Sequence, residues 1–349
     1  MSGHTRTAAS QQPVTFDPEF ARSPASIGNA GPPPVLDTPL ALREFTDACL
    51  GAQFEQLPAQ PSVTKTSTTI PSYDGAEIEF TRYQPPQTQT QTQTQTQTQT
   101  QTQTNSSEKL PALLYFHGGG MVAGTARLWT PVLANLAAES GVQIFAVEYR
   151  LAPEHPDPTP VEDCYAALTY LSSHAADLGV DPARIGLMGE SAGAGLAVGV
   201  ALAARDRRLG PPVKKQILVY PMLDDRSVAS WSSDSPLGRV AAPTVDVLAM
   251  CWRAYLGDAK AGRSDAAVSP YAAPSRAADL SGLPSTYMEV GGLDLFRDEC
   301  AAFAARLAAV NNYVEFHLFP GVPHGFDAAA GIGVVRRAFE GRMRSIKDI

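Results

Sequence analysis

The sequence predicts an α/β protein whose mostly parallel sheet is covered by helices on both faces. Short apolar runs, nearly continuous in hydrophobicity, alternate with helical segments over most of the chain. Such runs are typical of parallel strands buried on both faces, and their alternation with helices favours a doubly wound sheet with right-handed crossovers. The length of 349 residues suffices for one large domain of this class with an accessory piece, or for two modest domains.

Composition excludes several other classes of protein. Hydrophobic residues make up 44% and charged residues 18% of the chain, as in a soluble globular enzyme. The formal charge is −8 and the lysines and arginines form no block, so a nucleic-acid partner is not expected. The polar N-terminus does not resemble a secretory signal, and no run of about 18 apolar residues could span a membrane.

The four cysteines lie far apart and form no C-x-x-C pair. Such spacing argues against a zinc site and against a disulfide framework, and it fits the reducing environment of the cytosol. We therefore expect a cytoplasmic protein in which each cysteine serves as a small buried hydrophobic residue.

Residues 1–57 are expected to form a mobile arm followed by one helix of a cap. The arm covers residues 1–34, which are rich in Pro, Gly, Ser and Ala and end in three prolines. Over residues 39–54 apolar side chains recur at helical spacing, which predicts an amphipathic helix.

Two strands and a low-complexity tract come next. Thr-rich and alternating patterns predict strands over 63–70 and 76–83, joined as a hairpin by a turn at 73–75. A Gln-Thr repeat then occupies residues 87–104. The repeat has no apolar face that could offset the entropy of ordering it, so we expect a disordered, exposed loop.

Strands and helices alternate through the rest of the chain. Apolar runs predict strands at 111–116, 142–149, 184–188, 214–220, 285–290 and 313–319. Helices are predicted at 129–139, 161–176, 191–205, 296–310 and 331–346. The segment 224–267 interrupts this rhythm, with Ser/Asp/Pro-rich stretches around one helix-like run at 245–255. We expect this insertion to form a cap with the helix near residue 45, leaving 58–223 and 268–349 as the main α/β domain.

A G-x-S-x-G pattern occupies residues 189–193, directly between a predicted strand and a predicted helix. A sharp strand-to-helix turn of this kind holds its serine in a strained backbone conformation. The helix that begins behind the serine offers backbone N–H groups to a developing oxyanion. Ser191 is therefore the candidate nucleophile, and the N–H group of Ala192 is a candidate oxyanion donor.

Three consecutive glycines follow His117, immediately after a predicted strand. We interpret them as an oxyanion loop, in which the N–H groups of Gly118 and Gly119 act together with that of Ala192. A phosphate-binding loop is the competing interpretation, but no G-K-[S/T] follows and no G-x-G-x-x-G register is present. His117 itself is expected to be a structural turn residue.

Asp294 and His324 each follow a predicted strand, in the loops after 285–290 and 313–319. Both should therefore lie at the carboxyl edge of the sheet, where Ser191 also lies. Serine is a weak nucleophile at neutral pH and needs an imidazole to take its proton, while a buried carboxylate fixes the imidazole tautomer. The chain order Ser, Asp, His suits this arrangement.

Other residues compete for the roles of base and acid. The remaining histidines lie in the arm, in predicted helices or strands, or in turns and loops before the nucleophile: His4, His117, His155, His174 and His317. Asp298 and Glu299 should begin the next helix, where acidic side chains interact favourably with the helix dipole. Asp224 and Asp225 also follow a strand, one strand earlier, and remain an alternative position for the acid.

Together these motifs resemble the hormone-sensitive-lipase-like branch of the α/β-hydrolase esterases. The resemblance extends over about residues 60–349, apart from the Gln-Thr tract. The matching motifs are HGGG at 117–120, YRLAPEHP at 149–156, DLGVDPARI at 177–185, GESAG at 189–193, the Asp294 loop with its trailing Arg297-Asp298-Glu299, and HGF at 324–326.

This resemblance implies an α/β-hydrolase fold with an eight-stranded, mostly parallel sheet and a helical cap. It also implies hydrolysis of carboxylic esters, often short-chain, through an acyl-enzyme and without a cofactor or metal. The implied site comprises the triad Ser191, Asp294 and His324 and the oxyanion donors Gly118, Gly119 and Ala192. Two residues depart from the pattern: Met121 stands where an aromatic residue often follows HGGG, and Glu190 replaces a more frequent Asp or Thr.

Two other functions are compatible with the same fold. A dehydratase, lyase or acyltransferase acting on a pathway intermediate would use the same serine, and product analysis would distinguish it from a hydrolase. A non-catalytic small-molecule receptor of this group lacks the catalytic histidine, which is present here as His324.

Overall fold

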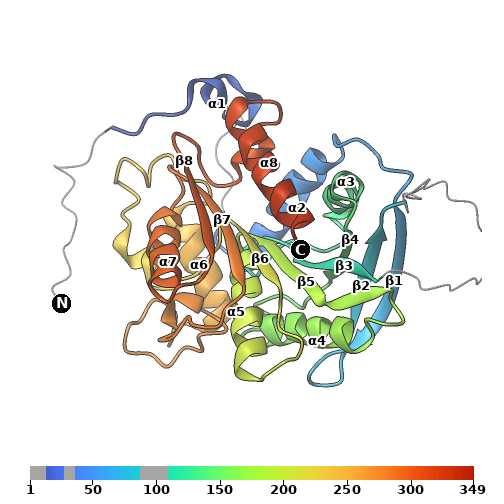
Figure 1. The fold of residues 1–349 in the computed structure, drawn as a ribbon. Coiled ribbons are helices and arrows are strands. Elements are labelled where there is room, and N and C mark those ends of the chain that lie inside the picture. The colour runs from blue at the N-terminus through green and yellow to red at the C-terminus, as the bar shows by residue number, and fades with distance from the viewer. Residues whose placement is uncertain (1–12, 27–35, 87–108) are drawn as a thin grey trace, which may run out of the picture.

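The structure is a computed structural model that describes residues 13–26, 36–86 and 109–349. One eight-stranded sheet runs through its centre, in the order β1-β2-β4-β3-β5-β6-β7-β8 (Figure 1). The strands are β1 (Thr64–Pro71), β2 (Glu77–Gln84), β3 (Leu110–Phe116), β4 (Gln143–Val147), β5 (Val180–Glu190), β6 (Lys215–Val219), β7 (Ser285–Gly291) and β8 (Val314–Phe319).

Most neighbouring strands of this sheet run parallel. β1 and β2 form an antiparallel hairpin, and β2 also pairs with β4 in the antiparallel sense. The five remaining pairs, from β4–β3 to β7–β8, are parallel. The carboxyl ends of β3, β5, β7 and β8 therefore meet at one edge of the sheet. The predicted fold class, an eight-stranded mostly parallel sheet with flanking helices, is confirmed.

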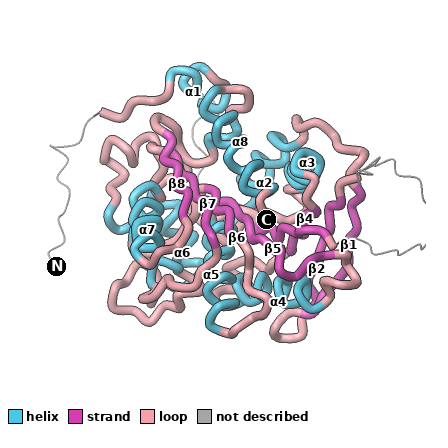
Figure 2. The backbone as a smooth tube through the Cα atoms, viewed as in Figure 1, coloured by secondary structure: helices cyan, strands magenta, loops and turns pink. Residues whose placement is uncertain are grey.

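Helices cover both faces of the sheet (Figure 2). α3 and α8 contact each other on one side, and α4 and α5 contact each other on the other side (Figure 1). The helices are α1 (Pro18–Arg22), α2 (Pro39–Phe54), α3 (Thr130–Ser140), α4 (Thr159–Ser173), α5 (Ala192–Asp206), α6 (Val245–Leu256), α7 (Arg297–Ala309) and α8 (Gly333–Lys347). None of the helices in the described part of the chain is long and apolar enough to cross a membrane.

Local sequence signals explain where α2 and α6 begin. Thr38 caps α2, because its hydroxyl accepts a hydrogen bond from the N–H group of Ala41 at 3.1 Å. Thr244 caps α6 in the same way by accepting from the N–H group of Val247 at 3.3 Å. α2 and α6 contact each other although they lie far apart in the sequence.

Within the expected mobile arm over residues 1–34, the structure places one short helix. Asp17 caps the short helix α1, whose Phe20 is buried, and the N–H group of Asp17 donates to Gly321 O at 2.7 Å. A helix of five residues is too short to show a periodic hydrophobic pattern, so it could not be predicted from the sequence. Residues 1–12 and the Gln-Thr tract at 87–104 lie outside the described residues.

The cysteines follow the expectation of burial with one exception. Cys164, Cys251 and Cys300 are buried, whereas Cys49 on α2 is exposed. All four thiols are free.

Candidate active site

Ser191 lies on the sharp turn between β5 and α5. Its backbone has φ 55° and ψ −119°, a strained conformation for a residue with a side chain. A Cβ atom on Gly193 would lie 2.1 Å from the carbonyl oxygen of Phe116, so only glycine permits β3 to end this close to the turn. The G-x-S-x-G pattern thus brings the loop after β3 next to the serine hydroxyl.

Ser191, His324 and Asp294 form a continuous chain of hydrogen bonds. His324 Nε2 lies 3.0 Å from Ser191 Oγ, and His324 Nδ1 lies 2.7 Å from Asp294 Oδ2. Asp294 is only 2% exposed, and its Oδ1 accepts from the N–H group of Phe296 at 2.8 Å. Since a carboxylate only accepts, the Nδ1 atom of the imidazole carries a proton and Nε2 is free to accept from the serine hydroxyl.

The loops that carry Asp294 and His324 are joined to each other. The N–H group of Gly292 donates to Phe319 O at 2.6 Å, and the N–H group of Leu293 donates to Val322 O at 2.9 Å. These bonds extend the parallel pairing of β7 and β8 beyond the ends of the strands. The sheet itself therefore sets the distance between carboxylate and imidazole.

The competing carboxylates lie elsewhere. Asp224 forms an ion pair with Arg226, and Asp225 forms one with Arg276. Asp298 and Glu299 lie in the first turn of α7, as predicted. The competing histidines within the described residues are also absent from the chain of bonds: His317 pairs with Glu315 on β8, and His174 ends α4.

His117 orients the glycine loop from behind. It is buried, and burial lowers the pKa of its imidazole to about 4, so the ring is neutral. Its Nδ1 lies 2.8 Å from the carbonyl oxygen of Gly118, which can only accept, so Nδ1 donates. Because C=O and N–H point in opposite directions across a trans peptide, this bond directs the N–H group of Gly119 away from His117.

Three backbone N–H groups near Ser191 have no acceptor among the described residues: those of Gly118, Gly119 and Ala192. A Cβ atom on Gly118 would lie 3.5 Å from Ser191 Cβ, which shows how close the loop comes to the serine. Gly119 has φ +121°, and a Cβ atom there would lie 2.0 Å from the carbonyl oxygen of Ala123. Gly119 is therefore required both by its backbone conformation and by the tight turn that follows it.

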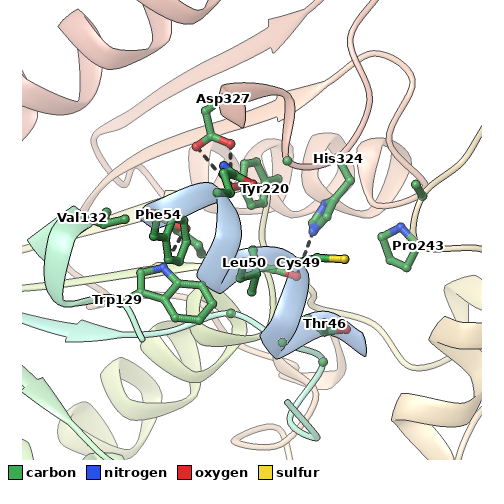
Figure 3. Close-up of a pocket in the computed structure, with 18 of the residues that line it drawn as sticks. Thr46, Cys49, Leu50, Phe54, Trp129, Val132, Tyr220, Pro243, His324 and Asp327 are labelled. Carbon is green, nitrogen blue, oxygen red and sulfur yellow. Dashed lines mark hydrogen bonds between the residues drawn. The ribbon is translucent and has the colours of Figure 1, made fainter. Parts of the chain in front are cut away.

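Ser191 and His324 open into a cavity of about 980 Å³ (Figure 3). Side chains from α2, α3, α6 and α8 line it, and most of them are apolar or aromatic. Figure 3 shows the His324 imidazole pointing into this cavity, with Phe54 and Trp129 on its far side. Both departures from the family pattern lie at this cavity. Glu190 lines it, and the buried Met121 directly follows the three glycines that also line it.

Charged residues that sequence reasoning missed support one wall of the cavity. Arg342 of α8 is buried and forms ion pairs with Glu289 and with Asp327, at 2.5 and 2.7 Å. Asp327 accepts from the hydroxyl of Tyr220 at 3.1 Å, and the Tyr220 ring lies 4.5 Å from the His324 ring. This chain of contacts holds the aromatic surface against which the imidazole packs (Figure 3).

Two carboxyl groups near the site have raised pKa values. Burial and the nearby Asp327 carboxylate raise the pKa of Glu190 to about 7. Burial raises the pKa of Glu299 to about 8. Glu299, in the first turn of α7, binds the loop that follows β6, since its Oε1 accepts from the N–H groups of Leu223 and Asp224 at 2.6 and 3.2 Å.

We expect Glu299→Gln to make the stability of the protein less sensitive to pH. In the unfolded chain a glutamate ionises near pH 4.3, roughly four units below the folded value. Between these values the folded protein holds one more proton than the unfolded chain, so its stability falls as the pH rises toward 8. From about pH 6 to about pH 8, the free energy of unfolding should fall by about 2 kcal/mol more in the wild type than in Glu299→Gln.

Urea titrations of both proteins at the two pH values measure this difference. Glutamine keeps the oxygen that accepts from Leu223 and Asp224, so the substitution removes the ionisation and preserves the shape of the side chain. Equal losses of stability in the two proteins would contradict the raised pKa.

Comparisons with known proteins agree with this geometry. A family model described as alpha/beta hydrolase fold matches residues 113–328. Esterase LipI of Mycobacterium tuberculosis is 36% identical over 225 residues, which cover 64% of this chain and 67% of LipI. Carboxylesterase NlhH of the same organism is 34% identical over 220 residues, covering 63% of this chain and 67% of NlhH.

Solved structures extend the likeness over nearly the whole chain. A bacterial heroin esterase superposes with a TM-score of 0.81 at 38% identity, covering 96% of this chain and 98% of the other. An esterase of Pyrobaculum calidifontis superposes with a TM-score of 0.76 at 30% identity, covering 95% and 98%. The resemblance inferred from the motifs is thus confirmed, and the chain belongs to the α/β-hydrolase fold family.

Proposed function

We propose that this protein is a serine hydrolase that cleaves carboxylic esters through an acyl-enzyme intermediate. The observation that carries the proposal is the chain of hydrogen bonds from Ser191 through His324 to the buried Asp294. It lies beside backbone N–H groups that have no acceptor among the described residues. The similarity to proteins named esterase and carboxylesterase supports the same reaction.

In the first half of the reaction, Ser191 Oγ attacks the ester carbonyl carbon while His324 Nε2 takes the hydroxyl proton. The carbonyl π electrons move to the oxygen, which becomes an oxyanion. When the tetrahedral intermediate collapses, the bond to the alcohol oxygen breaks and His324 returns the proton to that oxygen. Asp294 stabilises the imidazolium that exists between these two proton transfers.

In the second half, a water molecule replaces the alcohol. His324 takes a proton from the water, whose oxygen attacks the acyl carbon, and the proton then passes to Ser191 Oγ as the acid leaves. We assign stabilisation of the oxyanion in both halves to the N–H groups of Gly118, Gly119 and Ala192. Donors that are fixed before the reaction need no reorganisation when the charge develops.

The cavity supports a small-molecule ester as substrate. Its volume of about 980 Å³ lies at the upper end of the range typical of small-molecule sites. Its mostly apolar lining suits an acyl chain or an apolar alcohol. We also propose that α2 and the insertion at 224–267 form a cap over the α/β domain, since α2 contacts α6 and both helices line the cavity.

We propose a cytoplasmic location for the protein from the state of its cysteines. Four free thiols support a reducing compartment such as the cytosol.

Product analysis with the purified protein tests the proposed reaction. Given p-nitrophenyl esters of graded acyl length, the protein should release carboxylic acid and alcohol in equal amounts. Transfer of the acyl group to a second alcohol, or elimination without release of acid, would instead assign the site to an acyltransferase or a lyase. The acyl length that gives the highest kcat/KM shows how long an acyl chain the cavity accommodates.

A further inference from the structure

Helix α2 has two faces with different contacts. The residues on one face recur at helical spacing and line the cavity. They are Leu42, Phe45, Thr46, Cys49, Leu50, Gln53 and Phe54. The neighbouring face carries Arg43 and Asp47, which are one turn apart. Both of these side chains bind the loop that follows the oxyanion glycines.

Arg43 links this loop to a second loop, which contains Ala152 and Glu154. Its Nε donates to the carbonyl oxygen of Val122 at 2.6 Å, and its Nη2 donates to that of Ala152 at 2.8 Å. The same guanidinium forms two hydrogen bonds with the carboxylate of Glu154, at 2.9 and 2.7 Å. These bonds lower the pKa of Glu154 to about 2, so the pair stays charged over the neutral range.

Asp47 holds the other end of the same turn. Its Oδ1 accepts from the N–H group of Gly124 at 2.7 Å. A Cβ atom on Gly124 would lie only 2.6 Å from the carbonyl oxygen of Gly118, so the backbone of Gly124 packs directly on the peptide that carries the Gly119 N–H group. A shift of Gly124 would therefore be passed to that N–H group.

The turn between these two anchors is closed on itself. The carbonyl oxygen of Gly119 accepts from the N–H groups of Val122 and Ala123, at 3.1 and 2.9 Å. Within the described residues, the side chains that bond the backbone of residues 121–124 both come from α2. The turn is thus held from outside by these two side chains of α2 and by one backbone bond, in which the N–H group of Ala152 donates to the carbonyl oxygen of Met121 at 2.9 Å. Arg43 also binds the carbonyl oxygen of Ala152, so α2 contacts both the turn and its backbone partner.

The geometry points to Arg43 and Asp47 as positioning residues that hold the oxyanion loop in its active form, so that catalysis requires α2 to be docked on the loop. The helix then has two tasks: its cavity face binds the substrate, and its loop face directs the donors that bind the oxyanion. This inference rests on the proposed function, because it takes the N–H groups of Gly118 and Gly119 as oxyanion donors. It predicts a loss in kcat, whereas a helix that served only as a cavity wall would affect KM.

Two substitutions of Asp47 test this inference as a matched pair. Asp47→Ala removes the acceptor for Gly124 N–H, whereas Asp47→Asn keeps an oxygen at the same place. With a short p-nitrophenyl ester, we expect Asp47→Ala to lower kcat about tenfold or more and to leave KM within about threefold. Asp47→Asn should stay within about threefold of the wild-type kcat. Equal losses in the two variants, or a change confined to KM, would overturn the inference.

Arg43→Ala provides a second measurement, with Glu44→Ala as its control. Glu44 is exposed on the same helix, so its removal should leave kcat unchanged. Arg43→Ala should lower kcat by the same order as Asp47→Ala and should weaken, to a similar extent, the binding of an alkylboronic acid that mimics the tetrahedral intermediate. Unchanged boronic acid affinity would contradict the inference, and if Arg43→Ala does not fold, the Asp47 pair decides alone.

A fluorophosphonate probe separates this inference from the proposed function. If Asp47→Ala is still labelled at Ser191, the nucleophile and its base remain in place. A normal kcat in that labelled variant then overturns the positioning role and leaves the proposed reaction standing.

Discussion

Replacement of Ser191 with alanine should lower kcat for a short p-nitrophenyl ester by about 10⁵- to 10⁶-fold. The expectation follows from the position of the hydroxyl, which is the group within 3.0 Å of His324 Nε2 and next to the glycine loop. Without it no acyl-enzyme can form, and the residual rate comes only from water attacking a substrate held near the oxyanion donors. Steady-state kinetics over a range of enzyme concentrations measures the loss.

The alanine variant should fold like the wild type, because only one oxygen is removed from a side chain that faces the cavity. Its circular dichroism spectrum and Tm provide the control. A folded Ser191→Ala protein that keeps more than about one hundredth of the wild-type kcat would show that another group acts as nucleophile.

Asp294→Asn should lower kcat by about 10⁴-fold. In the wild type, the Asp294 carboxylate accepts a hydrogen bond from His324 Nδ1, which leaves Nε2 free to accept the serine proton. An asparagine amide can donate to Nδ1 and so favours the opposite tautomer, in which Nε2 carries a proton and cannot act as the base. The loss of negative charge also removes the stabilisation of the imidazolium.

Asp224→Asn is the matched control for this variant. It makes the same chemical change at the other post-strand position that the sequence left open for the acid, where the carboxylate pairs with Arg226. We expect its kcat to remain within about threefold of the wild type. A reversed outcome, with the larger loss at Asp224, would contradict the assignment of Asp294.

The fold could be predicted because its strands leave strong local signals. The buried parallel strands appear in the sequence as apolar runs, and the observed β3, β6, β7 and β8 begin and end within one or two residues of the expected ranges. β5 is the informative exception. It begins at Val180 rather than at residue 184, because Leu110 pairs with Val180 across an irregular register that no apolar run marks.

The reacting residues could be predicted for a related reason. Ser191 directly follows β5, while Asp294 and His324 lie in the loops after β7 and β8, and parallel strands bring such positions to one edge. The groups that support them could not be predicted in this way. Arg43 reaches the glycine loop from a helix 79 residues away, and Arg342 reaches Asp327 from the last helix. Such contacts depend on tertiary packing, and the polar residues that make them look locally like any exposed helix residue.

Ser191 Oγ should be the nucleophile that forms the covalent intermediate, and mapping an adduct on the protein tests this most directly. Diethyl p-nitrophenyl phosphate reacts with an activated serine and leaves a stable phosphoryl group in place of the acyl group. We expect activity to be lost in proportion to the formation of one adduct per chain, and peptide mass spectrometry should find that adduct on the peptide that contains Ser191. Full inactivation with an unmodified Ser191, or an adduct on a different residue, would contradict it.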